Sequence, residues 1–572
     1  MSERVWSVGH RRSVVVVRAK RRSGVMSSVV RRTRSLQRMT AHAARASAVV
    51  VPSSFTSSSP RGCGGVVRRR VYGVVASGGG GGGARTTTRR GEDAVTMMKM
   101  KIGTRGSGRG MTTTTTTTHA MAFGTTGMVT TVAAVTAAAA AAAMVMLRAR
   151  RTTEVRVTAS RTPSTASARA LEACAGIISQ GYDAVIGLTN THASTILSSL
   201  LRRDIDVVYQ REVLEMPNGG HATLDWPLSV GGDADATRAT MAPGAEGVCE
   251  VEAQGPPFVR KVFDQNVLVA RRMEEEQAKL PADAPVLVLM SGIAGGSHDK
   301  YLKHFMKRAR ASGFRTVAFN CRGCAESPLT TPQFYSASYT GDIRFVVDEL
   351  HRRFPNAPLL AIGWSLGANI LTNFLGEEGS QAKLTAAAAL CNPFDLNACD
   401  TALESGFFGT IYSRAMAKNM RKLFAPHENL FAGLPKYNPE LVRNAKTVRD
   451  FDEAVTAVTF GFPTVDAYYE YSGSKNKIQD VAIPLMTVQA LDDPIAVASA
   501  IPREKIEKNP NVILIETETG GHLGWEAGDE APFGAPWPDK LVMKFFQTIL
   551  MHAATTKVAH AEAPTERVEM SA

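Results

Sequence analysis

Residues 358 to 378, PLLAIGWSLGANILTNFLGEE, contain the pattern on which the prediction of the fold depends. The apolar run from Pro358 to Ile362 is typical of a buried strand, and the spacing of apolar residues from Ala368 to Leu375 is typical of an amphipathic helix. Glycines two residues before and two residues after Ser365 permit a strained turn between these elements. The stretch therefore predicts a sharp strand-to-helix turn that presents the hydroxyl of Ser365.

A Gly-x-Ser-x-Gly motif on its own is also compatible with a tight turn that has no chemical role. The N-terminus of the following helix would favour negative charge that develops beside Ser365. A serine hydroxyl is a weak nucleophile unless a base takes its proton, and we expect that base to be a histidine oriented by a carboxylate. A chemical role for Ser365 thus depends on partners elsewhere in the chain.

Two later strand ends carry such partners. The apolar run Pro484 to Ala490 precedes Asp492 and Asp493, and the run Val512 to Glu516 precedes His522, which follows two glycines. In an α/β hydrolase the acid and then the histidine follow the nucleophile in this order, at the carboxyl ends of later strands. We predict Asp493 rather than Asp492 as the acid, because the proline after it fixes the turn and the other side chain points away. A buried histidine with a purely structural role is the alternative for His522.

A glycine-rich turn, SGIAGGS at 291 to 297, follows the apolar strand Val286 to Met290. In a serine hydrolase this is the place for the second donor to a developing oxyanion, so we predict the backbone N–H groups of Ile293 and Leu366 as the pair. An ordinary strand-to-helix loop with Ser297 as the helix N-cap is the alternative.

The order of elements predicts a mostly parallel sheet flanked by helices. A strand at Arg315 to Asn320 and a helix at Asp342 to Arg353 continue the β-α-β alternation, which right-handed crossovers turn into a parallel sheet. Cys321 and Cys324 form a Cys-x-x-Cys between them, which we interpret as a strand-end turn, because no second pair stands at zinc-ligand spacing. We therefore expect no metal and no cofactor.

The first 151 residues differ from the rest in composition. They hold 26 of the 66 Lys and Arg residues but 3 of the 52 Asp and Glu residues, so the net charge of +14 belongs to this region and the remainder is mildly acidic. A nucleic-acid partner is therefore not expected. An Arg- and Ser-rich, acid-poor beginning is typical of an organelle transit segment, with the chloroplast ahead of the mitochondrion; a solvated low-complexity tail is the alternative.

Residues 120 to 147 carry no charged side chain and are long enough to cross a bilayer. They are mostly Ala and Thr, which gain little on transfer to lipid, so either a membrane segment or a processing region is possible. Seven scattered cysteines suggest reduced thiols.

We expect the folded part to begin near 165. Its first part, 165 to 391, holds a helix at 190 to 198 and a hairpin at 207 to 227, both with a structural role, and an insertion at 228 to 283. An aromatic-rich helical cap is predicted at 392 to 480, because this length exceeds a plain crossover, and most of its rings are expected to pack the cap. The sheet is completed by 481 to 556, and 557 to 572 is a tail.

Seven motifs between 190 and 555 resemble those of the α/β-hydrolase branch that includes bacterial YheT and the plant embryogenesis-associated proteins. They are GIAGGSHDKYL (292–302), NCRGCAESPLTTPQFYSASYTGD (320–342), GWSLGAN (363–369), CNPFDL (391–396), DFDEAVT (450–456), ALDDPI (490–495) and GGHLGWEAG (520–528). The usual His-Gly before the oxyanion turn is Ser291-Gly292 here, which we expect to alter loop packing and not activity.

The resemblance implies a Ser, Asp and His triad on Ser365, Asp493 and His522, and hydrolysis of carboxylic esters such as monoacylglycerols, phospholipids or short-chain esters. The expected partner is thus a small lipid or ester, with a membrane surface as a further possibility. Two alternatives remain: an acyltransferase that uses the same triad, and a non-catalytic lipid-binding protein with the same fold.

Overall fold

The computed structural model describes residues 145, 149–230 and 279–562, and the statements that follow concern these residues. The expected transit segment, the charge-free stretch 120–147 apart from Val145, and most of the insertion expected at 228–283 lie outside them. Among the described helices, none combines the length and the apolar character needed to cross a membrane.

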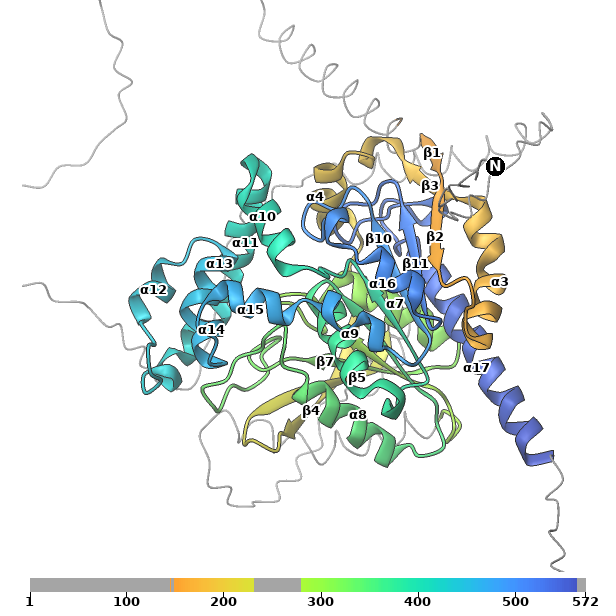
Figure 1. Cartoon of the computed structure of the whole chain (residues 1–572), viewed down its shortest axis with the longest axis horizontal. Coiled ribbons are helices and arrows are strands. Elements are labelled where there is room, and N and C mark those ends of the chain that lie inside the picture. Colours follow the sequence, from red (N-terminus) through yellow and green to blue (C-terminus); the bar gives the residue numbers. More distant parts are fainter. Residues whose placement is uncertain (1–144, 146–148, 231–278, 563–572) are drawn as a thin grey trace, which may run out of the picture. The chain divides into compact units, whose positions relative to one another are not determined.

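A nine-stranded mixed sheet forms the centre of the described chain, in the order β2-β11-β10-β9-β8-β6-β7-β5-β4 (Figure 1). The six strands from β11 to β7 are parallel, whereas β2 at one edge and β5 and β4 at the other are antiparallel to their neighbours. The strands are β2 Val155–Ala159, β4 Val207–Glu215, β5 His221–Val230, β6 Val286–Met290, β7 Arg315–Asn320, β8 Leu359–Trp364, β9 Ala386–Leu390, β10 Leu485–Ala490 and β11 Val512–Thr517. This confirms the predicted fold class.

A separate two-stranded sheet lies near the beginning of the described chain. It pairs β1 (Arg150–Thr153) with β3 (Tyr182–Val185) in antiparallel register. The main sheet begins with β2, which pairs along β11, so the core starts earlier than the predicted boundary at 165.

Strand β6 shows why both faces of the sheet are covered. Its side chains alternate: Leu287 and Leu289 lie in one hydrophobic core, and Val286, Val288 and Met290 lie in the other. Because successive side chains of a strand point to opposite faces, a continuous apolar run such as this one needs a layer of helices on each side.

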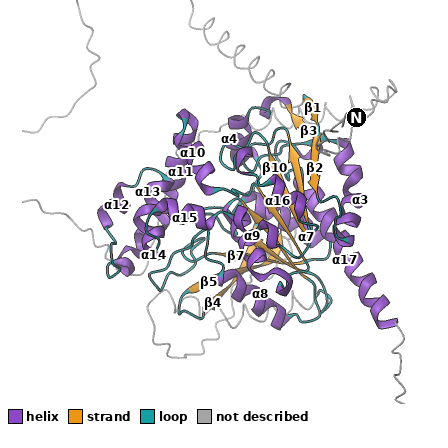
Figure 2. Ribbon diagram, in the orientation of Figure 1, coloured by secondary structure: helices purple, strands orange, loops and turns teal. Residues whose placement is uncertain are grey.

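The two helical layers lie on opposite faces of the sheet (Figure 2). Apolar side chains of α3 (Thr165–Gln180), α7 (Lys300–Ala311) and α17 (Pro538–Glu562) belong to one core. Those of α8 (Gly341–Arg353), α9 (Leu366–Glu378) and α16 (Arg503–Lys508) belong to the other. The helices predicted at Asp342–Arg353 and Ala368–Leu375 are present as α8 and α9, and α9 is longer than predicted.

A helical cap occupies the segment between β9 and β10, to the left of the sheet in Figure 1. Its elements are α10 Leu396–Glu404, α11 Gly406–Phe424, α12 Pro439–Asn444, α13 Val448–Phe451, a π-helical turn Asp452–Thr456, α14 Ala457–Thr459 and α15 Val465–Ser472. Phe424, Phe431 and Phe451 are buried against one another, so these rings pack the cap, whereas Phe407 is 75% exposed.

The amides of Asn369 and Asn373 tie this cap to the core. On α9, both side-chain amides donate to the carbonyls of Ala337 and Ser472 at 2.8–3.1 Å. The helix that carries the nucleophile turn thus also holds the end of the cap in place.

Asp539, in the first turn of α17, is a buried carboxylate whose oxygens have no hydrogen-bond partner among the described residues. Burial raises the pKa of Asp539 to about 7, although the guanidinium groups of Arg308 and Arg202 oppose this shift. An acid with a raised pKa binds its proton more tightly in the folded state than in the unfolded state. The stability of the protein should therefore fall as the pH rises from about 4 to about 7.

We expect Asp539→Asn to stabilise the protein above neutral pH, because the substitution removes a buried charge. The gain in the free energy of unfolding should be on the order of 3 kcal/mol at about pH 8, and it should shrink toward zero near pH 4. Denaturant unfolding of both proteins at several pH values measures this difference. A gain that is the same at every pH, or a loss, would contradict it.

Candidate active site

Ser365 lies at the turn between β8 and α9 with φ of 52° and ψ of −120°, a strained backbone conformation for a residue other than glycine. The flanking positions have no space for a side chain. A Cβ at Gly363 would lie 2.5 Å from the carbonyl oxygen of Gly367, and a Cβ at Gly367 would lie 2.4 Å from the carbonyl oxygen of Ser291. The Ser365 N–H donates to Leu390 O on β9 at 2.8 Å. The turn is the nucleophile elbow that the sequence predicted.

The structure brings Ser365, His522 and Asp493 together from three strand ends. The Ser365 hydroxyl lies 3.0 Å from His522 Nε2, and His522 Nδ1 lies 2.8 Å from Asp493 Oδ2. Because Asp493 offers only acceptors as a carboxylate, the tautomer that fits has Nδ1–H donating to it, and Nε2 then accepts from the serine. All three residues are more than 90% buried. This arrangement lets the imidazole take the serine proton.

The two adjacent aspartates have different positions. Asp493 Oδ1 accepts from the N–H groups of Ile495 and Ala496 at 2.8 Å each, which fixes the carboxylate while its other oxygen faces the imidazole. The alternative acid, Asp492, accepts from the Gly521 N–H at 2.8 Å and from the Thr191 hydroxyl at 3.2 Å. Asp492 therefore holds the loop that carries His522 and does not contact the ring through a hydrogen bond.

Helix α4 (Thr191–Leu201) supports the loop that carries His522. The Thr195 hydroxyl accepts from the His522 N–H at 3.0 Å, and a Cβ at Gly521 would lie 2.7 Å from it. The Ser194 hydroxyl lies 3.0 Å from both Gly520 O and Glu526 Oε2. We expected only a structural role for this part of the chain, and that expectation missed its contacts with the site.

The buried Arg202, directly after α4, donates hydrogen bonds to the same loop. Its Nη2 donates to the carbonyls of Leu523 at 3.0 Å and Gly524 at 2.7 Å. Burial lowers the pKa of Arg202, while the carboxylates of Glu526 and Asp539 oppose the shift. Arg202 therefore holds the loop that carries His522.

We expect Arg202→Lys to lower kcat about 10-fold with KM changed less than about 2-fold, because the lysine side chain is one bond shorter and its ammonium does not reach the position from which Nη2 donates to both carbonyls. Ester hydrolysis per mole of folded enzyme, with the folded fraction taken from the unfolding curve, measures the effect. Arg203→Lys is the matched control, since its side chain is exposed, and should leave kcat unchanged. Equal losses in the two variants would contradict a positioning role.

The turn at Ser291–Ser297 is braced on both sides of Ile293. The Gly292 N–H donates to the hydroxyl of Tyr301, and the Ala294 N–H donates to the hydroxyl of Tyr335, both at 3.1 Å. Ile293 and Leu366 line the cavity that contains Ser365, and within the described ranges neither N–H has a protein acceptor. The pair is thus available to an oxyanion.

Ser291 stands where the resemblance leads one to expect histidine. Its hydroxyl hydrogen-bonds with Asp299 and, at 2.8 Å, with Tyr301. The side chain therefore contributes to the packing of the turn.

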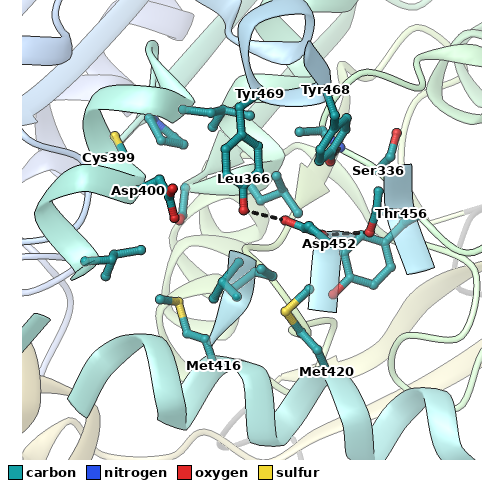
Figure 3. Close-up of a pocket in the computed structure, with 18 of the residues that line it drawn as sticks. Ser336, Leu366, Cys399, Asp400, Met416, Met420, Asp452, Thr456, Tyr468 and Tyr469 are labelled. Atoms are coloured by element: carbon teal, nitrogen blue, oxygen red, sulfur yellow. Dashed lines mark hydrogen bonds between the residues drawn. The ribbon is translucent and has the colours of Figure 1, made fainter. Parts of the chain in front are cut away.

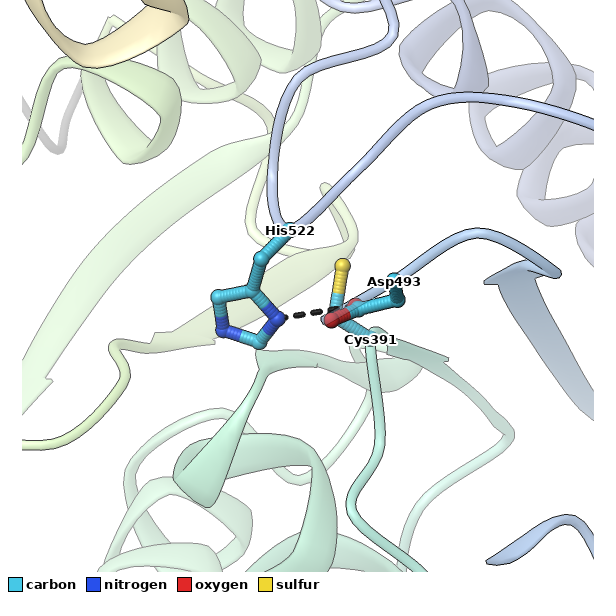
Figure 4. A group of neighbouring side chains, drawn as sticks. All are labelled: Cys391, Asp493 and His522. Carbon is cyan, nitrogen blue, oxygen red and sulfur yellow. Dashed lines mark hydrogen bonds and ion pairs between the residues drawn. The ribbon is translucent and has the colours of Figure 1, made fainter. Parts of the chain in front are cut away.

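One group in the described chain has the spacing of a metal site: Cys391, Asp493 and His522, drawn in Figure 4. The hydrogen bond between the ring and the carboxylate already accounts for their closeness. The Cys391 thiol accepts from the Leu523 N–H at 3.3 Å, and burial raises its pKa well above the usual value. Each of the three donors already has a hydrogen-bond partner in the protein, which fits a hydrolytic site better than a metal site.

The Cys321-x-x-Cys324 segment is a closed turn. The Cys324 N–H donates to Cys321 O at 3.0 Å, and both thiols are free. Burial raises the pKa of Cys321 to about 12 and that of Cys324 well above its usual value. Buried thiols that keep their protons react slowly in thiol–disulfide exchange.

A cavity of about 730 Å³, open solvent at its mouth included, lies over Ser365 between the sheet and the cap. Most of its lining is apolar, and Met416 and Met420 reach into it from α11 (Figure 3). The lining residues are Ile293, Phe334, Tyr335, Ser336, Ala337, Ser365, Leu366, Pro393, Leu396, Cys399, Asp400, Leu403, Met416, Met420, Val448, Asp452, Thr456, Tyr468, Tyr469 and Ile495.

The sheet, the nucleophile elbow and the residues gathered at the strand ends define an α/β hydrolase. A family model described as "alpha/beta hydrolase fold" matches residues 285–528. The chain is 42% identical over 362 residues to the embryogenesis-associated protein EMB8 of Picea glauca, covering 63% of this chain and 70% of that protein. The chain belongs to the α/β-hydrolase family, in the branch that contains this spruce protein.

Two relatives from Saccharomyces cerevisiae have names that state an activity. The chain is 33% identical to a monoacylglycerol lipase, covering 59% of this chain and 74% of the lipase. It is 31% identical to medium-chain fatty acid ethyl ester synthase/esterase 2, covering 59% of this chain and 79% of that enzyme.

Proposed function

We propose that this protein hydrolyses lipid acyl esters through an acyl-enzyme on Ser365. The observation that carries the proposal is the chain of hydrogen bonds from Ser365 through His522 to Asp493 beneath a mostly apolar cavity. An apolar cavity suits an acyl chain, because each buried methylene contributes about 0.8 kcal/mol. Relatives named as lipases and esterases support a carboxylic ester hydrolase over a lipid-binding protein without activity.

In the proposed cycle His522 Nε2 takes the proton of Ser365 as its Oγ attacks the ester carbonyl. The N–H groups of Ile293 and Leu366 hold the oxyanion, and Asp493 stays ionised and orients the imidazole. His522 then gives its proton to the leaving alcohol. Water, activated by the same imidazole, hydrolyses the acyl-enzyme and restores the serine.

The test uses the purified full-length chain with a monoacylglycerol, a lysophospholipid and a short-chain ester. We expect release of fatty acid from at least one of them, together with covalent labelling by a fluorophosphonate probe. A protein that is folded but neither labelled nor able to release fatty acid would overturn the proposal.

A second candidate function is acyl transfer to an alcohol, which the name of the yeast synthase/esterase favours. The same acyl-enzyme would then react with an alcohol in place of water. Product analysis with and without added alcohol separates the two: a new ester that forms faster than free fatty acid supports the transferase.

We also propose a chloroplast location, on the basis of the Arg- and Ser-rich composition of residues 1–151. A fluorescent fusion to this segment should enter plastids. Fluorescence that stays in the cytosol, or that enters mitochondria, would contradict the proposal.

A further inference from the structure

One wall of the cavity over Ser365 is polar. Five residues with hydroxyl or carboxylate groups lie on it: Ser336, Asp452, Thr456, Tyr468 and Tyr469 (Figure 3). Most of the remaining lining is apolar, so the cavity offers two different environments to the two parts of an ester. An acyl chain suits the apolar walls, and the polar wall then faces the alcohol part.

Asp452 is the centre of this wall. Its Oδ1 accepts from the Thr456 hydroxyl at 2.6 Å, and its Oδ2 accepts from the Tyr469 hydroxyl at 3.0 Å. Each carboxylate oxygen has two acceptor sites, so each can take one more donor. Burial raises the pKa of Asp452 to about 6, and the neighbouring Asp400 adds to the shift. The carboxylate is therefore still mostly ionised at neutral pH.

No cation pairs with Asp452 in the described part of the chain. Asp400, which lines the same cavity, differs, since it forms an ion pair with Arg449 at 2.7 Å. A buried carboxylate without a cation is costly unless hydrogen-bond donors surround it. Asp452 has two donors from the protein and space in the cavity for more.

The backbone around Asp452 is also unusual. Residues Asp452–Thr456 form one π-helical turn between α13 and α14, and such turns occur often at functional sites. This turn brings the Asp452 and Thr456 side chains together on the cavity side. A carboxylate that served only to anchor Tyr469 would not need to line the cavity.

We propose that Asp452, with the hydroxyls of Thr456 and Tyr469, binds the alcohol part of the ester and selects alcohols that carry free hydroxyl groups, such as the glycerol of a monoacylglycerol. The inference rests on the proposed ester hydrolysis at Ser365. Hydroxyl groups fit better than a quaternary ammonium, because the tyrosine at 469 directs its hydroxyl, and not its ring face, toward Asp452 (Figure 3). Burial raises the pKa of Tyr469 well above its usual value, so this hydroxyl keeps its proton.

The test compares two esters of one acyl chain, monodecanoylglycerol and ethyl decanoate, with the full-length protein and its Asp452→Asn variant. The amide keeps the shape of the carboxylate but loses its charge. We expect kcat/KM for the monoacylglycerol to fall about 10- to 100-fold, because hydrogen bonds to a charged acceptor are stronger than those to a neutral one. The value for the ethyl ester should change less than about 3-fold.

Tyr469→Phe and Thr456→Val are the second pair of variants. Each removes one hydroxyl and keeps the carboxylate, so each should shift the ratio of the two kcat/KM values in the same direction by a smaller factor. They also keep the test possible if Asp452→Asn does not fold. The rate of fluorophosphonate labelling shows whether Ser365 remains assembled in every variant.

Equal losses on both esters would mean that Asp452 supports only the structure of the cap, and would overturn the inference. Decanoyl lysophosphatidylcholine is a third substrate, and a loss restricted to it would overturn the hydroxyl subsite in favour of a cation subsite. If the unaltered protein hydrolyses the ethyl ester but does not prefer the glycerol ester, the inference fails and the proposed function stands. If it hydrolyses neither ester and is not labelled, both fail.

Discussion

Ser365→Ala is expected to lower kcat for ester hydrolysis by about 10³-fold or more. The substitution removes the oxygen that lies 3.0 Å from His522 Nε2, and the described residues bring no other hydroxyl into hydrogen-bond contact with the imidazole. An alanine side chain fits the strained turn as well as serine does, because both have a single atom at the β position. The fold should therefore be retained, and substrate binding in the cavity should change little.

Initial rates with a short-chain ester and labelling by a fluorophosphonate probe check this expectation. The variant should lose labelling completely while its thermal unfolding stays within a few degrees of the unaltered protein. A variant that keeps near-normal hydrolysis would show that Ser365 is not the nucleophile.

Asp493→Asn should have an effect of similar size, a fall in kcat of about 10³- to 10⁴-fold. The carboxylate accepts from His522 Nδ1–H, whereas an asparagine side chain can turn its amide donors toward the ring and favour the wrong tautomer. His522 Nε2 would then carry the proton and could no longer accept one from Ser365. The loss should appear in kcat and leave KM nearly unchanged.

Asp492→Asn is the matched control for this prediction. Its carboxylate accepts from the Gly521 N–H and the Thr191 hydroxyl, and the carbonyl oxygen of an asparagine can still accept one of these bonds. We expect a fall in kcat of less than about 10-fold. A reversed order, with the larger loss at Asp492, would mean that the acid is assigned to the wrong residue.

Much of the fold was predictable because its strands and helices have strong local patterns. The strands predicted at Val286–Met290 and Arg315–Asn320 are present with the predicted ends. β8 extends two residues beyond the predicted end, since Gly363 and Trp364 still pair with β9. That pairing is a contact between distant residues, which the local pattern of 358–378 does not contain.

The parts that sequence reasoning missed depend on contacts between distant residues. Strand β2 adds to the edge of the sheet through its pairing with β11, and nothing in its own five residues identifies that partner. Ser365, Asp493 and His522 could be predicted because each follows the end of an apolar strand. The contacts of α4 with the loop around His522 could not be predicted in this way. A hint existed: Thr191, Ser194, Thr195 and Ser198 repeat at helical spacing and place hydroxyls on one face.

The contacts between α4 and the loop around His522 join two parts of the chain that lie far apart in the sequence. Along the chain, α4 precedes the turn that carries Ser365, and the loop that it holds follows that turn. Under the proposed mechanism, a chain in which this loop has not docked would have Ser365 without its base and would not hydrolyse esters. Recovered hydrolysis after refolding would therefore report that the two distant parts have docked, and not merely that the sheet has formed.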